Sequence, residues 1–351
     1  MNKNKLALLC ATTCAASACV AATDDSSGVV LKQLDDRVRV EINGQLFTEY
    51  YFKDVTKPYC YPIIGPTGAG MTRDWPMKNT PGEEHDHLHH TGLWFGHQKV
   101  NGYNFWSAGP TLGKVIQESL TTTNTGKDSA AITTVNRWVA TNGTVVLRDE
   151  RTLRFYNRTN DRILDFEITL KATEGNVTFG DDKDGIMGIR IPESMRVLKP
   201  TPKGDPAKPS DGHIVLSSGV QDNGATAAAA KDAKREAQTW GRRAQWCDYY
   251  GPVDGKTVGI AMFDHPDNPR HPTWWHVRDY GLMAANPFGE HFFENLKDGN
   301  AGNYILRSGL TTTFRYRFYF HEGDAAQADV AGHYKEYVRS AANPVKQADA
   351  P

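Results

Sequence analysis

Long stretches of this chain alternate apolar and polar residues. In the segment "ILDFEITLKA" (163–172), every second residue from Leu164 to Leu170 is apolar, and single polar residues separate them. A period of two residues is typical of a strand that buries one face in an antiparallel sheet. Further segments of this character are 37–44, 144–157, 257–265 and 313–321. The sequence therefore predicts many half-buried antiparallel strands.

Helical periodicity is found mainly near the C-terminus. Val330, Tyr334, Tyr337 and Val338 recur there at the spacing that places them on one face of a helix. Many strands and one closing helix predict a mainly β protein, built as a large antiparallel β-sandwich with a short C-terminal helix.

The sandwich is expected to form a single domain over 23–340, followed by a tail at 341–351. Two segments within it look like insertions. The first, 199–213, has four prolines and no apolar period, which is typical of a loop. The second, 224–238, is either a short exposed helix or a mobile arm, and its alanine, lysine and glutamate content favours the helix.

Residues 1–22 are expected to be a signal peptide, so the protein is predicted to be exported. Lys3 and Lys5 precede an uncharged run that is too short for a spanning helix, and no other stretch approaches the roughly 18 apolar residues of a membrane span. An alternative is lipid attachment at Cys19, because "ASAC" (16–19) resembles a lipobox. The expected location is the periplasm, the outer membrane through such a lipid, or the extracellular space.

The charge balance argues against two classes of partner. The formal net charge is −1, with acidic and basic residues interspersed. Neither nucleic acid nor an anionic membrane surface is therefore an expected partner. Beyond the leader, Cys60 and Cys247 are the remaining cysteines, which is too few for a disulfide scaffold.

Histidines concentrate between 83 and 106. If this segment is extended, His85, His87 and His89 share one face and could bind a divalent metal. The spacing does not match the HExxH motif of a zinc helix, and a polar substrate site or structural hydrogen bonding are the alternatives. The neighbouring Trp94 is suited to pack against the apolar face of a sugar ring.

A second group of charged residues lies at 179–193. Lys183, Asp184 and Arg190 stand there among glycines. The segment could be a charged hairpin on the surface. The functional interpretation is a loop that brings a lysine and a carboxylate for proton transfer, and an arginine for an anion, into one site.

A third group lies at 263–289. Several prolines indicate irregular backbone, and irregular loops with polar and aromatic side chains are where ligand sites are found. The candidate site residues of this segment are His265, Arg270, His276, Arg278, Asp279 and Asn286.

Three segments resemble the motifs of one protein family. "HLHHTGLWFGHQKVNGYNFW", "FGDDKDGIMGIR" and "HPTWWHVRDYGLMAANPFG" are similar to motifs of the PmoA-like, or DUF6807, proteins, which are exported by bacteria that consume polysaccharides. The resemblance covers about residues 58 to 322. Leu88 and Thr91 depart from it, because a proline and often an arginine are expected at these positions.

The resemblance implies a galactose mutarotase-like supersandwich, a fold that hosts epimerases, glycosidase domains and polysaccharide lyase domains. Such a fold does not by itself fix the function. The family's name also implies methane oxidation, but a particulate methane monooxygenase subunit is a polytopic membrane protein. A metal-dependent oxidoreductase is therefore the disfavoured alternative.

Taken with the motifs, the sequence predicts a carbohydrate-active enzyme that works by acid–base chemistry, through lysis, hydrolysis or epimerisation. A non-catalytic carbohydrate-binding protein is the alternative from another class. No cofactor is predicted, and a divalent metal stays an alternative. The predicted catalytic residues are His90, His265, His276, Lys183 and Asp184. The predicted substrate-binding residues are His87, Trp94, His97, Arg190, Arg270, Arg278, Asp279 and Asn286.

Overall fold

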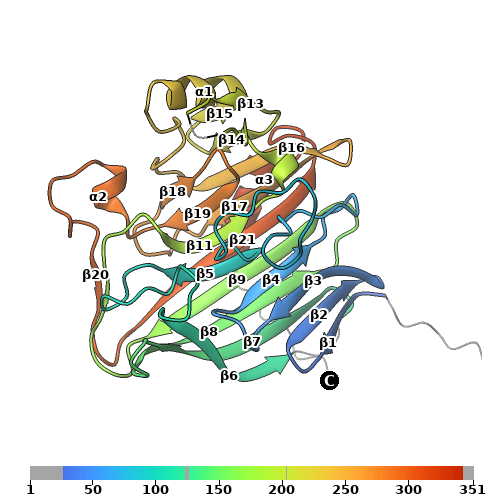
Figure 1. Ribbon diagram of the computed structural model, residues 1–351. Helices are drawn as coiled ribbons and strands as arrows, with labels where there is room; N and C mark the ends of the chain where they lie inside the picture. Colours follow the sequence, from blue (N-terminus) through green and yellow to red (C-terminus); the bar gives the residue numbers. More distant parts are fainter. Residues whose placement is uncertain (1–26, 123–125, 203, 343–351) are drawn as a thin grey trace, which may run out of the picture.

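Two antiparallel sheets lie face to face in the computed structural model of the protein (Figure 1). The structure describes residues 27–122, 126–202 and 204–342. The predicted signal peptide with Cys19, and positions 343–351 of the predicted tail, lie outside the described residues. Within the part of the chain that is described, no helix is long and apolar enough to cross a membrane.

The first sheet has eight strands. Its spatial order is β1 (Val29–Gln33), β2 (Arg37–Ile42), β3 (Gln45–Tyr51), β4 (Tyr59–Ile63), β5 (Leu93–His97), β11 (Gly185–Arg190), β19 (Leu282–Asn286) and β18 (Trp274–Val277). The last four strands come from the three sequence motifs, one from each of the first two and a hairpin from the third. Antiparallel pairing therefore brings all three motifs to one end of the same sheet.

The second sheet has nine strands. Its spatial order is β15 (Gln221–Asn223), β14 (His213–Leu216), β16 (Trp246–Val253), β17 (Lys256–Asp264), β21 (Thr311–Glu322), β9 (Arg162–Lys171), β8 (Val145–Tyr156), β7 (Ser129–Val139) and β6 (Lys114–Thr122). Two short pairs lie outside both sheets, β10 (Val177–Phe179) with β20 (Tyr304–Leu306) and β12 (Leu198–Lys199) with β13 (Lys208–Pro209). A 3-10 turn, η1, covers Glu193–Met195.

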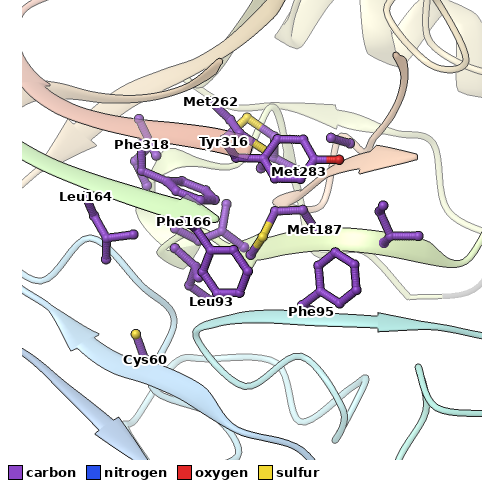
Figure 2. Packing of buried hydrophobic residues seen from close by; sticks show 14 of the residues in the cluster. Cys60, Leu93, Phe95, Leu164, Phe166, Met187, Met262, Met283, Tyr316 and Phe318 are labelled. Carbon is purple, nitrogen blue, oxygen red and sulfur yellow. The ribbon is translucent and has the colours of Figure 1, made fainter. Parts of the chain in front are cut away.

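The apolar faces of the two sheets form the main core (Figure 2). Phe95 and Met187 of the first sheet lie in it with Phe166 and Phe318 of the second, and the rings of Phe95 and Phe166 stack at 6.2 Å. The alternating segments of the sequence are thus strands with one face in this core. The predicted fold class, a large antiparallel β-sandwich, is confirmed.

The C-terminal helix covers part of the outer face of the second sheet. α3 (Val330–Ala342) packs Val330, Tyr334 and Tyr337 against Phe263 and other outward residues of this sheet. The apolar face predicted for this helix is confirmed. The helix also extends two residues into the segment that we expected to be tail, positions 341 and 342.

The second insertion is a helix that is not simply exposed. α1 (Gly224–Asp232) is capped at its N-terminus by Asn223, whose side chain accepts from two backbone amides in the first turn. Its Ala227 and Ala228 belong to the main core cluster, so one face of the helix is buried. A short second helix, α2 (Glu290–Phe293), follows β19.

The two cysteines of the domain are free and buried on different sheets. Cys60 lies on β4 and Cys247 on β16. Burial raises the pKa of the Cys60 thiol to about 12, and burial also raises the pKa of the Cys247 thiol well above its usual value. Both therefore remain protonated and behave as small apolar side chains.

Candidate functional site

The outward face of the first sheet carries a row of large and small residues across four strands. Gly188 pairs with Trp94 on one side and with Ala284 on the other, and Ala284 pairs with His276. A Cβ at Gly188 would lie 3.0 Å from ring atoms of both Trp94 and Trp106. The two indoles thus pack over a strand position that only glycine leaves open, with Ala284 separating them from His276.

A tight turn gathers three histidines beside this row. The His90 amide donates to the His87 carbonyl at 2.9 Å, and His87 has a φ of 42°. The rings of His87 and His90 stack at 4.6 Å, and His89 meets His90 edge-on at 4.4 Å. The segment is not extended, as a shared face of His85, His87 and His89 would require, because this turn folds the His87 and His90 rings onto each other.

His85 lies apart from the turn. Its ring stacks on Trp75 at 3.9 Å, and its Nε2 is 3.1 Å from the Asn79 side-chain oxygen. Within the described residues, no group of three or more histidine, cysteine, aspartate or glutamate side chains is placed to hold one metal ion. His85, His87 and His89 are therefore not brought together as a ligand set.

Trp94 lies beneath the histidine turn. It is fully buried, and the His90 ring stacks on it at 5.0 Å. Trp106 packs beside it with a centroid distance of 5.1 Å. Protein atoms therefore cover the Trp94 face that the sequence suggested for a sugar, and the indole supports His90 instead.

Arg190 fixes the tautomer of His90. The guanidinium Nη1 lies 3.2 Å from His90 Nδ1. Because arginine can only donate, Nδ1 must be the acceptor and the ring proton sits on Nε2. Asp86 holds Arg190 at 3.5 Å and also pairs with the buried Arg73. His90 is thereby presented as a neutral ring with an Nε2–H donor.

His276 is fixed in the opposite tautomer. Its Nδ1 donates to the Lys183 carbonyl at 2.6 Å, which leaves the lone pair on Nε2. The buried Asn286 amide donates to the same carbonyl at 2.8 Å. Asp184 lies 3.7 Å from Nδ1 and pairs with the Lys183 ammonium at 3.0 Å. The structure thus brings Lys183, Asp184 and Asn286 to His276, and Asn286 acts by positioning the loop.

Aromatic and cationic side chains connect the two histidine groups. Tyr280 stacks on His87 at 5.0 Å, and the Arg190 guanidinium lies 4.8 Å from the Tyr280 ring centroid. The Arg278 guanidinium lies 5.7 Å from the centroid of the same Tyr280 ring. Asp279, between them in sequence, is half-buried. We define the outer-face site as His87, His89, His90, Lys183, Asp184, Arg190, His276, Arg278 and Tyr280.

Burial keeps three imidazoles of this site, those of His89, His90 and His276, uncharged. Desolvation, together with the nearby Lys57, lowers the pKa of His89 to about 3. Desolvation and Arg278 lower the pKa of His276 to about 3, and burial lowers the pKa of His90 well below its usual value. Burial and neighbouring cations therefore make these three rings neutral donors and acceptors.

A buried lysine lies under the same site. Lys57 Nζ donates to the Trp106 carbonyl at 2.7 Å and lies 5.9 Å from the Trp94 ring centroid. No carboxylate of the described chain lies within ion-pair distance of it. Burial lowers the pKa of Lys57 to about 7.

Three residues predicted for the site lie elsewhere. His97 is buried in the core against Phe288, with Nε2 bonded to a backbone carbonyl at 2.7 Å. His265 lies by the second sheet, against Tyr337 of α3. Arg270 donates to three backbone carbonyls and holds loops together.

Sequence reasoning missed Tyr280, Trp106 and Lys57. Tyr280 follows Arg278 and Asp279 directly, and Trp106 ends the first motif, so their motif membership was a usable signal. No sequence signal marked Lys57, because its burial depends on contacts with β5 and the loop after it.

Solved structures that match this chain include galactose mutarotase-like proteins and alpha-galactosidases. One is a galactose mutarotase-like protein from Lactobacillus casei, with 8% identity over 84% of this chain and 100% of that chain, and a TM-score of 0.36. Another is a putative aldose 1-epimerase from Escherichia coli, with 12% identity over 84% and 99%, and a TM-score of 0.37. A third is a GH36 alpha-galactosidase from Geobacillus stearothermophilus, with 8% identity over 85% and 41%, and a TM-score of 0.41.

Similarity at this level does not bear on what the chain acts on. No curated protein matches it. A family model does: the one described as a family of unknown function, DUF6807, matches residues 37–335. Because this match covers most of the sequence, the chain belongs to the DUF6807 family.

Proposed function

We propose that this protein is an exported carbohydrate-active enzyme, and that it acts on a sugar or oligosaccharide at the outer-face site by acid–base chemistry. The observation that carries the proposal is a pair of neutral histidines held in opposite tautomers on one face of a sheet. His90 offers an Nε2–H donor and His276 offers an Nε2 acceptor. No described residue hydrogen-bonds either Nε2 atom, so both are free for a ligand.

In this mechanism His276 is the general base. Its Nε2 would take a proton from a sugar hydroxyl, from a C–H next to a carbonyl group, or from an attacking water. Asp184, 3.7 Å from Nδ1, would stabilise the imidazolium that forms. The Lys183 carbonyl keeps the ring oriented throughout the transfer.

His90 would act as an electrophile. A neutral imidazole that donates from Nε2 can stabilise negative charge developing on a substrate oxygen. Arg190, bonded to Nδ1, supports that donor with its positive charge. Lys183, whose side chain is 43% exposed and pairs with Asp184 beside His276, would donate a proton from its ammonium to the product, and it would regain one from water as His276 releases the proton it took. This division of roles fits lysis, hydrolysis and epimerisation alike.

The test is product analysis on neutral, uronic and 3-keto sugars and their oligosaccharides, by proton NMR and mass spectrometry. Wild type is compared with His276→Gln, with His90→Gln and with His265→Gln, a matched control outside the site. We expect turnover to fall by at least about 100-fold in the first two variants and to be unchanged in the control. Ligand-induced shifts without any product would instead indicate a binding protein. Equal losses in all three variants would reject the assigned roles.

A further inference from the structure

A cavity of about 860 Å³ lies next to the outer-face site, between α1, the segment 235–243 and α2. Figure 1 shows α1 and α2 near the β18 end of the first sheet. Trp240 and Phe293 provide an aromatic wall, and Arg235 and Arg242 are among its polar lining residues. The volume is in the range of ligand pockets, which run to roughly 1,000 Å³.

One aromatic pair separates this cavity from the proposed base. The Trp240 and Phe293 rings pack edge-to-face at 5.2 Å, and their centroids lie 6.4 and 6.3 Å from that of His276. The Arg278 guanidinium lies 5.9 Å from the Trp240 ring. The cavity and His276 are therefore separated by the thickness of one aromatic pair.

The charged residues that line the cavity leave an excess of positive charge. Glu236 pairs with Arg278 at 3.0 Å, and Glu294 accepts from the Trp274 indole at 2.6 Å. Arg235 and Arg242 have no carboxylate partner among the described residues; a backbone carbonyl 3.3 Å away accepts from Arg242 Nε. Two exposed guanidiniums in one cavity are suited to a carboxylate or a sulfate, whose planar or tetrahedral oxygens match their paired N–H groups.

The aromatic wall also contains a hydrogen-bond donor without an acceptor among the described residues. The Trp240 indole Nε1 is buried and has no hydrogen-bond acceptor among the residues that the structure describes. A buried donor without a partner costs free energy, which a ligand oxygen would recover. An aromatic face, an indole N–H donor and two guanidinium groups together are suited to recognise an anionic sugar rather than an apolar molecule.

We infer that this cavity is a subsite for an anionic sugar unit, bearing a carboxylate or a sulfate ester, of an oligosaccharide whose neighbouring unit lies at His276. This inference rests on the proposed function and narrows its substrate to acidic glycans of at least two units. Arg235 and Arg242 bind the anionic group, and Trp240 and Phe293 pack against the ring.

The experiment measures binding by calorimetry with His276→Gln as the background, so that turnover is not required. The probes are galacturonic acid oligomers, sulfated galactose oligomers and neutral galactose oligomers, each from one to four units long. The test variant adds Arg235→Gln and Arg242→Gln. The matched control adds Lys256→Gln and Arg307→Gln, which remove the same charge from exposed positions elsewhere.

We expect one acidic series to bind, with affinity rising steeply from one unit to two or three. The test variant should lose at least about tenfold for that series, and the control should not. The series that binds identifies the anionic group. Equal binding of neutral and acidic series, equal loss in both variants, or no binding of any series would overturn the inference. Turnover of acidic oligomers by wild type with no arginine dependence would keep the proposed function and reject only this subsite.

Discussion

Replacing Lys57 by methionine is expected to stabilise the protein at neutral pH. Lys57 is 1% exposed, and burial lowers its pKa from 10.5 to about 7. Each pKa unit corresponds to about 1.4 kcal/mol, so a shift of about 3.5 units sets an upper limit of roughly 5 kcal/mol for the cost of its charged form. The lost hydrogen bond to the Trp106 carbonyl offsets about 1 kcal/mol of this gain.

The sign of the pH dependence follows from proton binding. Between pH 7 and 10.5 the unfolded chain binds a proton at Lys57 that the folded chain does not, because the folded pKa is the lower one. The free energy of unfolding of the wild type therefore rises with pH across this window. The advantage of Lys57→Met should be largest below about pH 7 and should disappear near pH 10.5.

The assay is urea denaturation of both proteins at several pH values from 6 to 10. At each pH the free energy of unfolding of wild type is subtracted from that of the variant, so that the contributions of other titrating groups cancel. Lys256→Met is the control, since the Lys256 side chain is 54% exposed and should give no pH-dependent difference. Parallel plots of the free energy of unfolding against pH for wild type and Lys57→Met would refute the reasoning, because a lysine whose pKa is not shifted by folding adds no pH dependence.

Three further predictions address packing, a buried ion pair and the thiols. Gly188→Ala places a methyl group 3.0 Å from two indole rings and should cost about 1–3 kcal/mol, seen as a lower melting temperature. Asp149→Leu leaves the buried guanidinium of Arg151 without its partner and should cost about 3–5 kcal/mol in urea denaturation. Adding Arg151→Met should recover part of that loss, and a still less stable double variant would contradict this. Replacing Cys60 and Cys247 by alanine should leave turnover unchanged, and its loss in a folded variant would show that a thiol takes part.

The strands and the C-terminal helix were predictable because burial of one face leaves a local period. β9 shows it from Leu164 to Leu170 and β21 shows it from Thr312 to Phe318. Val330 and Tyr334 mark the buried side of α3. The histidine turn was not predictable. An alternating pattern fits an extended segment, and a single left-handed residue at His87 is enough to bring the rings together.

His265 and His276 illustrate what the sequence could not predict about the site. They lie in one short sequence segment, and both were assigned to catalysis. β17 of the second sheet ends at Asp264, and β18 of the first sheet begins at Trp274. The chain crosses between the sheets over residues 265–273, and it places the two histidines in different environments.

The sequence by itself determined which segments are strands, which of their faces are apolar, and which motifs concentrate titratable and aromatic side chains. All of these depend on residues a few positions apart. Only the tertiary structure decided the protonation of the site. The Arg190 contact that fixes His90 spans 100 positions, and the Lys183 carbonyl that fixes His276 lies 93 positions away. Tautomer and pKa depend on desolvation and on such distant partners, which strand pairing brings together and local pattern does not encode.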